Sequence, residues 1–154
     1  PEQTNALVNS GVSAIAYESV VAEDKSYPLL IPMSEIAGRM AVQAGASCLE
    51  KAKGGSGILM GGVTNVDPAK VTIIGGGVVG YNAIEIALGM QANVTVLDKS
   101  AARLDYLETV FGDDLNAVLA DSTSNETFIA AADLVIGAVL VPGHLHPRLY
   151  PGVC

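Results

Sequence analysis

A glycine turn between two apolar runs is the part of this sequence best suited to chemistry. Residues 71–74 form a short apolar run, and Gly75, Gly77 and Gly80 follow it with Gly-x-Gly-x-x-Gly spacing. In such a turn the first glycine permits a tight bend, the second lets the backbone approach a pyrophosphate, and the third lets a helix pack on the strand. A helix that starts there points free N–H groups at the phosphates. The turn therefore predicts a phosphate-binding site.

The residues around the turn extend this prediction to a dinucleotide. Residues 93–98 read as a second strand, which Asp98 closes 18 residues after Gly80. A carboxylate about 20 residues after the turn is where the adenosine ribose is bound in a βαβ unit. The alternative is a strand, turn and helix with only a structural role. Between the strands, a helix is predicted from apolar spacings of three and four at Val79, Ala83, Ile86, Ala87 and Met90.

Asp98 also favours one cofactor over another. A carboxylate at the ribose hydroxyls repels the extra phosphate of NADP, so NAD is the predicted cofactor. Lys99 and Arg103 follow closely, and a cation there can accept that phosphate. Their alternative role is that of solvated charges on the next helix, and we take this as the expectation.

Composition limits the class of protein. The 154 residues suffice for one core but not for two complete domains, and 50% of them are hydrophobic against 16% charged. A net charge of −8 disfavours nucleic acid and anionic membranes as partners. With no long apolar stretch and no signal-peptide pattern, a soluble cytoplasmic protein is expected.

Neither the cysteines nor the histidines predict a metal or catalytic site. Cys48 and Cys154 are far apart, and His144 and His146 have no third ligand nearby. We expect the histidines to be solvated loop residues.

Three zones follow one another along the chain, at residues 1–31, 32–67 and 68–154. The first is expected to end an upstream catalytic domain, with a strand at residues 12–17. The second is an interdomain helix over residues 32–53, capped by Ser34, followed by a Gly-rich connector. The apolar residues predicted to line one face of this helix are Ile36, Met40, Ala44 and Leu49.

The third zone is predicted to be an α/β domain of Rossmann type, a doubly wound parallel sheet that this chain leaves incomplete. Further helices are expected at residues 101–111 and 125–131, and further strands at residues 116–119 and 133–140. Ligands of such sheets bind beyond the carboxyl ends of the strands. Residues 137–143 are therefore expected to border the nicotinamide side.

Several segments, in the same order, resemble the alanine dehydrogenase family. They are residues 14–18, 32–40, 54–63, 77–83 and 132–143. The NAD-binding subunit of nicotinamide nucleotide transhydrogenase is similar at the glycine turn and the long helix, but less so in the connector and the last segment. A non-catalytic NAD-binding module is the other alternative.

The resemblance implies reversible oxidative deamination of L-alanine to pyruvate and ammonium, with hydride transfer to NAD, in a homohexamer. It places NAD contacts at Ser34, Val78, Val79, Asp98, Arg103, Val139 and Leu140. A serine of the family aligns near Ala120, so that contact is in doubt, although Ser122 is close in sequence. The family's catalytic residues lie outside these 154 residues, and the chain alone is expected to be inactive.

Overall fold

The computed structural model describes residues 2–140, which form two compact units divided between Met33 and Ser34. The first unit contains helix α1 (Glu2–Ser10) and the 3₁₀ turn η1 (Tyr17–Ser19). The strand predicted at residues 12–17 is wrong, because residues 12–16 have no regular structure. A strand needs a neighbour for its backbone N–H and C=O groups, and the described residues supply none here; Ile15 is 83% exposed.

Helix α2 (Ile31–Cys48) is the long helix predicted from the second zone, but it begins earlier than expected. Pro32 lies in its first turn, where the missing N–H of proline costs nothing. Ser34 is therefore inside the helix and is not its N-cap, which corrects the prediction. The helix ends at Cys48, and the 3₁₀ turn η2 (Lys51–Lys53) follows it.

The large apolar residues that predicted α2 do not form its buried face. Ile36 and Met40 are 59% and 58% exposed, whereas Gly38, Val42 and Gly45 are the buried residues of the helix. A Cβ atom on Gly45 would lie 2.5 Å from Leu134. Small residues thus bring α2 close to Leu134 of the neighbouring sheet. The larger apolar side chains are exposed on the other side of the helix.

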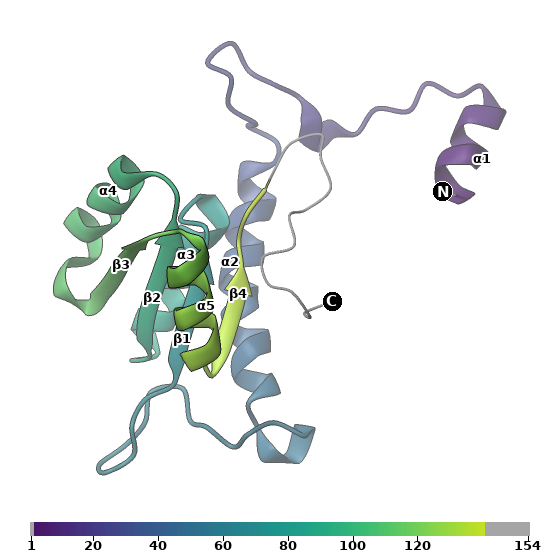
Figure 1. Ribbon diagram of the computed structural model, residues 1–154. Coiled ribbons are helices and arrows are strands. Elements are labelled where there is room, and N and C mark those ends of the chain that lie inside the picture. Colours follow the sequence, from purple (N-terminus) through teal and green to yellow (C-terminus); the bar gives the residue numbers. More distant parts are fainter. Residues whose placement is uncertain (1, 141–154) are drawn as a thin grey trace. The chain divides into compact units, whose positions relative to one another are not determined.

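Four parallel strands form the sheet of the second unit, in the order β3-β2-β1-β4 (Figure 1). They are β1 (Lys70–Ile74), β2 (Asn93–Asp98), β3 (Leu115–Leu119) and β4 (Leu134–Gly137). The register aligns Ile74 with Leu97 on one side and with Gly137 on the other. The carboxyl ends of three strands therefore meet at the glycine turn, and the predicted Rossmann-type parallel sheet is confirmed.

Helices connect these strands and cover both faces of the sheet. They are α3 (Val78–Gly89), α4 (Ala101–Phe111), which runs into η3 (Gly112–Asp114), and α5 (Ser122–Ala131). Ile73 packs toward α3, whereas the Thr72 hydroxyl on the opposite face donates to the carbonyl of Phe128 on α5, at 3.1 Å. Figure 1 shows α5 in front of the sheet and α2 behind it. The largest fully buried side chains of this core include Ile73, Ile84, Val96, Leu97 and Leu107.

The bounds of α5 and β4 also differ from the predictions. Helix α5 begins at Ser122, three residues early, because Asp121 accepts a hydrogen bond from the Ser124 N–H and serves as its N-cap. Strand β4 covers only Leu134–Gly137 of the predicted run. Within residues 2–140, none of the helices combines the length and the apolar composition that crossing a membrane requires.

Candidate functional site

The turn after β1 needs glycine at two positions for steric reasons. Gly75 has a φ of 101°, and a Cβ there would lie 2.8 Å from the carbonyl oxygen of Ala138. A Cβ on Gly80 would overlap the carbonyl of Gly75. The first glycine thus makes the bend next to β4, and the third lets α3 pack against the turn, as the spacing predicted.

Gly77 differs from both, because a Cβ there would meet nothing within 4 Å. It is the exposed N-cap residue of α3, and no side chain caps that helix end. The first N–H groups of a helix have no partner within the helix and carry partial positive charge. An anionic group can therefore approach the backbone at Gly77, Val78 and Val79, and the open space suits a phosphate.

Asp98, at the end of β2, is bound to the same turn. One carboxylate oxygen accepts from the Gly76 N–H at 2.7 Å, and the other accepts from the Ser100 N–H at 2.8 Å. Each carboxylate oxygen can accept a further hydrogen bond. The half-buried Asp98 therefore places a negative charge and free acceptor capacity beside the glycine turn.

Arg103, on α4, does not behave as a solvated charge, which corrects one expectation. Its Nε donates to the Gly76 carbonyl at 2.5 Å. Its guanidinium carbon lies 4.8 Å from the ring centroid of Tyr106 and 5.9 Å from that of Tyr81, within cation–π range. Arg103 thus binds the carbonyl of the same glycine whose N–H is bound by Asp98.

The residues directly after β4 lie against the glycine turn, and their place on the nicotinamide side stays a prediction. The Ala138 N–H donates to the Ile74 carbonyl at 2.7 Å, and a Cβ on Gly75 would be 3.1 Å from Val139. Val139 is half-buried, and Leu140 is 54% exposed. The predicted residues 141–143, like His144, His146 and Cys154, lie outside the described residues.

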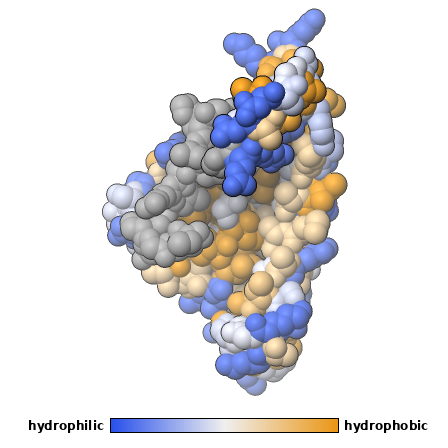
Figure 2. Space-filling model, turned by 90° about the vertical axis from the view of Figure 1, so that its right-hand side faces the viewer, coloured by the Kyte–Doolittle hydropathy of each residue, from blue (hydrophilic) through white to orange (hydrophobic). Residues whose placement is uncertain are grey.

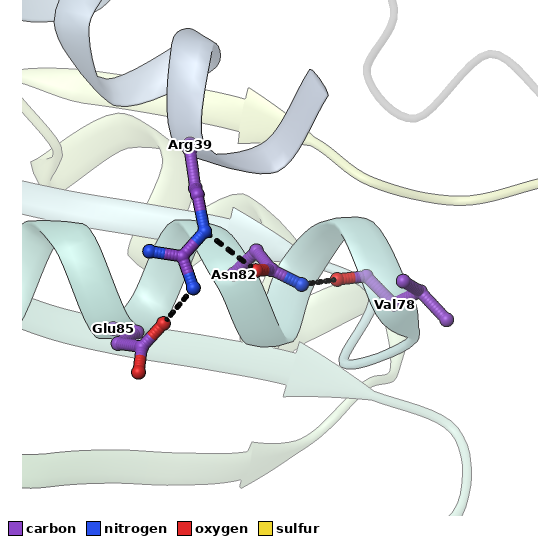
Figure 3. A network of polar contacts seen from close by, with 4 residues as sticks. All are labelled: Arg39, Val78, Asn82 and Glu85. Atoms are coloured by element: carbon purple, nitrogen blue, oxygen red, sulfur yellow. Dashed lines mark hydrogen bonds and ion pairs between the residues drawn. The ribbon is translucent and has the colours of Figure 1, made fainter. Parts of the chain in front are cut away.

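The contact between α2 and α3 was missed by the sequence analysis. Ser34 is half-buried inside α2, but the helix touches the start of α3 one turn later, where a Cβ on Gly38 would overlap the Val79 carbonyl. The next residue, Arg39, donates through Nε to the Asn82 side chain (Figure 3). Two glycines seven residues apart, at positions 38 and 45, were the available signal, because that spacing places both on one helix face.

Metal-ligating residues do not gather in the described part of the chain: between residues 2 and 140, no three His, Cys, Asp or Glu side chains could hold one ion. Cys48 is an exposed free thiol. The chemistry available at the turn is thus anion binding by backbone N–H groups next to one fixed carboxylate.

Together, the parallel sheet, the glycine turn at a helix N-terminus and the acidic residue ending β2 define a dinucleotide-binding domain of Rossmann type. Residues 41–151 match the family model described as "Alanine dehydrogenase/PNT, C-terminal domain". The chain belongs to this family.

Individual relatives agree with the family match. The chain is 50% identical over 149 residues to an alanine dehydrogenase of Methanococcus maripaludis and 53% identical over 146 residues to one of Halomonas elongata. These alignments cover 97% and 95% of the chain, and the chain spans about two fifths of each relative's length, 40% and 39%.

Two solved structures are also similar. An L-alanine dehydrogenase matches 97% of this chain and 42% of its own, with a TM-score of 0.88 and 51% identity. A transhydrogenase from Sinorhizobium meliloti matches 97% of this chain and 44% of its own, with a TM-score of 0.65. Its 24% identity supports a shared fold and nothing more.

Proposed function

We propose that this chain is the NAD-binding part of an L-alanine dehydrogenase. The observation that carries this proposal is the identity of about half the residues to alanine dehydrogenases along at least 95% of the chain. The much lower identity to a transhydrogenase, 24%, favours the dehydrogenase over that alternative.

The reaction proposed for the whole protein converts L-alanine, NAD⁺ and water to pyruvate, ammonium, NADH and a proton. Bound NAD⁺ would supply the acceptor for the hydride of the substrate Cα, and water would hydrolyse the resulting imine. The residues of this chain bind and orient the cofactor, while the groups that bind alanine and move protons are proposed to lie in the portion of the relatives that the chain does not cover.

Each part of the site fits one part of NAD. The pyrophosphate is proposed to lie over Gly77, with the N–H groups of Val78 and Val79 directed at it. The ribose hydroxyls of adenosine are proposed to donate to Asp98, whose charge disfavours the 2′-phosphate of NADP. Ser34 is proposed to be a further NAD contact, and Val139 and Leu140 are proposed to lie near the far half of the cofactor. Two observations support this proposal: the space beside Gly77 is open, and no side chain caps the N-terminus of α3.

The division into domains is also part of the proposal. We propose that residues 1–31 end a catalytic domain, that residues 32–67 link the domains, and that residues 68–154 begin the nucleotide domain. The family resemblance also implies a homohexamer. Exposed apolar residues on α2, Ile36 and Met40, are compatible with further protein contacts in the longer protein.

Activity of the full-length protein tests the reaction. We expect NADH formation that depends on L-alanine, and binding of NAD without turnover by the 154-residue chain alone. An absence of alanine oxidation by the full-length protein, with NAD binding retained, would support a non-catalytic NAD-binding module instead. Turnover by the isolated chain would show that the catalytic groups are within it.

A matched pair of glycine variants tests the binding site. Gly77→Ala places a methyl group in the space proposed for the pyrophosphate, whereas Gly89→Ala places one on exposed helix surface, and neither Cβ meets an atom within 4 Å. We expect Gly77→Ala to weaken NAD binding by about tenfold or more, and to lower the melting temperature only slightly because alanine is a poorer N-cap than glycine. Gly89→Ala should leave NAD binding unchanged. Equal NAD affinities in the two variants would contradict the pyrophosphate assignment.

A further inference from the structure

Helices α2 and α3 are in backbone contact at one point. Gly38 of α2 is buried against the Val79 carbonyl and the Cβ of Asn82, with no room for a side chain. This contact joins α2 to the first turn of α3, which carries the N–H groups proposed to bind the pyrophosphate.

A chain of hydrogen bonds crosses the helix contact beside Gly38 (Figure 3). Nε of Arg39 donates to Oδ1 of Asn82 at 3.0 Å, and Nδ2 of Asn82 donates to the Val78 carbonyl at 3.0 Å. An Nη atom of Arg39 also pairs with Glu85 at 2.5 Å. Asn82 is only 6% exposed, so the bond from Arg39 satisfies an amide oxygen that solvent reaches poorly.

The partners of Asn82 determine its orientation. Its amide oxygen must face the Arg39 donor, and its amide nitrogen must face the Val78 carbonyl. In the opposite orientation the amide nitrogen would face the Arg39 N–H and the amide oxygen would face the Val78 carbonyl, so neither hydrogen bond could form. The buried amide therefore links the position of the Arg39 guanidinium to that of the Val78 carbonyl. The pair with Glu85 does not do this, because both of its side chains are about half exposed, 48% and 45%.

We propose that Arg39 is a positioning residue for the pyrophosphate of the bound dinucleotide, acting through Asn82 on the first turn of α3. This proposal depends on the proposed function, because it presumes that the turn binds a dinucleotide. It assigns to α2 a role in cofactor affinity in addition to its role as a connector.

Arg39→Lys and Glu85→Gln in the full-length protein form the test. Lysine keeps the charge near Glu85 but has no Nε–H fixed toward Asn82, whereas Glu85→Gln changes only the exposed pair. The Kd values for NADH and for adenosine, which has no phosphate, are measured by titration together with the melting temperature. For Arg39→Lys we expect the NADH Kd to rise about tenfold, the adenosine Kd to stay within about twofold, and the melting temperature to be nearly unchanged. Glu85→Gln should keep both Kd values.

Asn82→Leu provides the second comparison, because leucine fills a similar space without hydrogen bonds. If Arg39 acts through Asn82, adding Arg39→Lys to Asn82→Leu should not weaken NADH binding further. Additive losses, an unchanged NADH Kd in Arg39→Lys, or equal losses for NADH and adenosine would overturn the positioning role. The wild-type titration tests the proposed function separately: if the wild-type protein binds no NADH, both proposals fail, whereas an effect missing only in the variants rejects the role of Arg39 alone.

Discussion

At the scale of single residues, the backbone of Gly76 organises the turn. The N–H of Gly76 donates to Asp98, and its carbonyl accepts from Arg103. A carboxylate at the end of β2 and a guanidinium on α4 therefore hold the two sides of the same glycine. Both charged side chains fix the turn without a ligand, and such preorganisation would lower the cost of binding the proposed dinucleotide.

Asp98→Asn tests the ribose assignment. The amide keeps the size of the side chain but removes the charge and one of the two acceptors that bind Gly76 and Ser100. We expect NAD affinity to fall about tenfold and the preference for NAD over NADP to shrink. Titration with both nucleotides measures this.

Asp113→Asn is the matched control for that substitution. It removes the same charge in η3, which comes directly before β3. Asp113 therefore lies near the amino ends of the parallel strands, whereas the glycine turn lies at their carboxyl ends. NAD affinity and selectivity should not change in this variant. If Asp98→Asn also keeps both, the carboxylate does not bind the ribose.

Residues near the glycine turn were predictable because a βαβ unit fixes the spacing between its glycine turn and the acidic end of its second strand. Gly75, Gly77, Gly80 and Asp98 lie where the spacing placed them. Arg39 and Asn82, by contrast, are 43 residues apart, and no pattern within either helix records that they meet.

At the scale of elements, the N-cap of α5 shows how side-chain hydrogen bonds begin a helix. The backbone N–H of Ser124 donates to Asp121, and the Ser124 hydroxyl accepts from the Asp121 N–H, so the two residues form a capping box. The hydrogen bonds from the Ser124 backbone and then from its side chain lower the pKa of Asp121 below 3.8.

Acid should therefore weaken this end of α5. A carboxyl group whose pKa is lowered by folding stabilises the folded state above its unfolded pKa, and that contribution is lost as the pH falls through the lower, folded value. We expect the urea midpoint of wild-type protein to fall between pH 5 and pH 3 by more than that of Asp121→Asn, which caps without titrating. Equal falls in the two proteins would show that the cap does not contribute to acid sensitivity.

Helix α2 shows why an apolar pattern can indicate the wrong face. Large apolar residues at helical spacing, such as Ile36 and Met40, usually face a core. Instead Gly38 and Gly45 face the domain, because the backbone of α2 approaches α3 and Leu134 too closely for larger side chains. Figure 2 shows apolar residues gathered on the side of the molecule where α2 and β4 lie in Figure 1.

At the scale of the whole molecule, cofactor binding should stabilise the fold. A ligand that binds only the folded state adds about 2.7 kcal/mol at a concentration of about 100 times its Kd. We expect NAD to raise the melting temperature of the full-length protein, and ADP-ribose, which keeps the pyrophosphate and both ribose groups, to raise it as well. NADP should have a smaller effect at equal concentration. Equal shifts with NAD and NADP would contradict the selectivity assigned to Asp98.

The sequence by itself determined the parallel α/β sheet, the glycine turn and the acidic end of β2, because alternating apolar runs and fixed glycine spacings express local backbone requirements. Tertiary structure alone decided which face of α2 is buried, how Arg103 holds Gly76, and how Arg39 reaches the first turn of α3 through Asn82. It also decided that residues 12–17 form no strand. These features depend on which distant segments meet, since hydrogen bonds and close packing across elements leave no periodic signal in either segment.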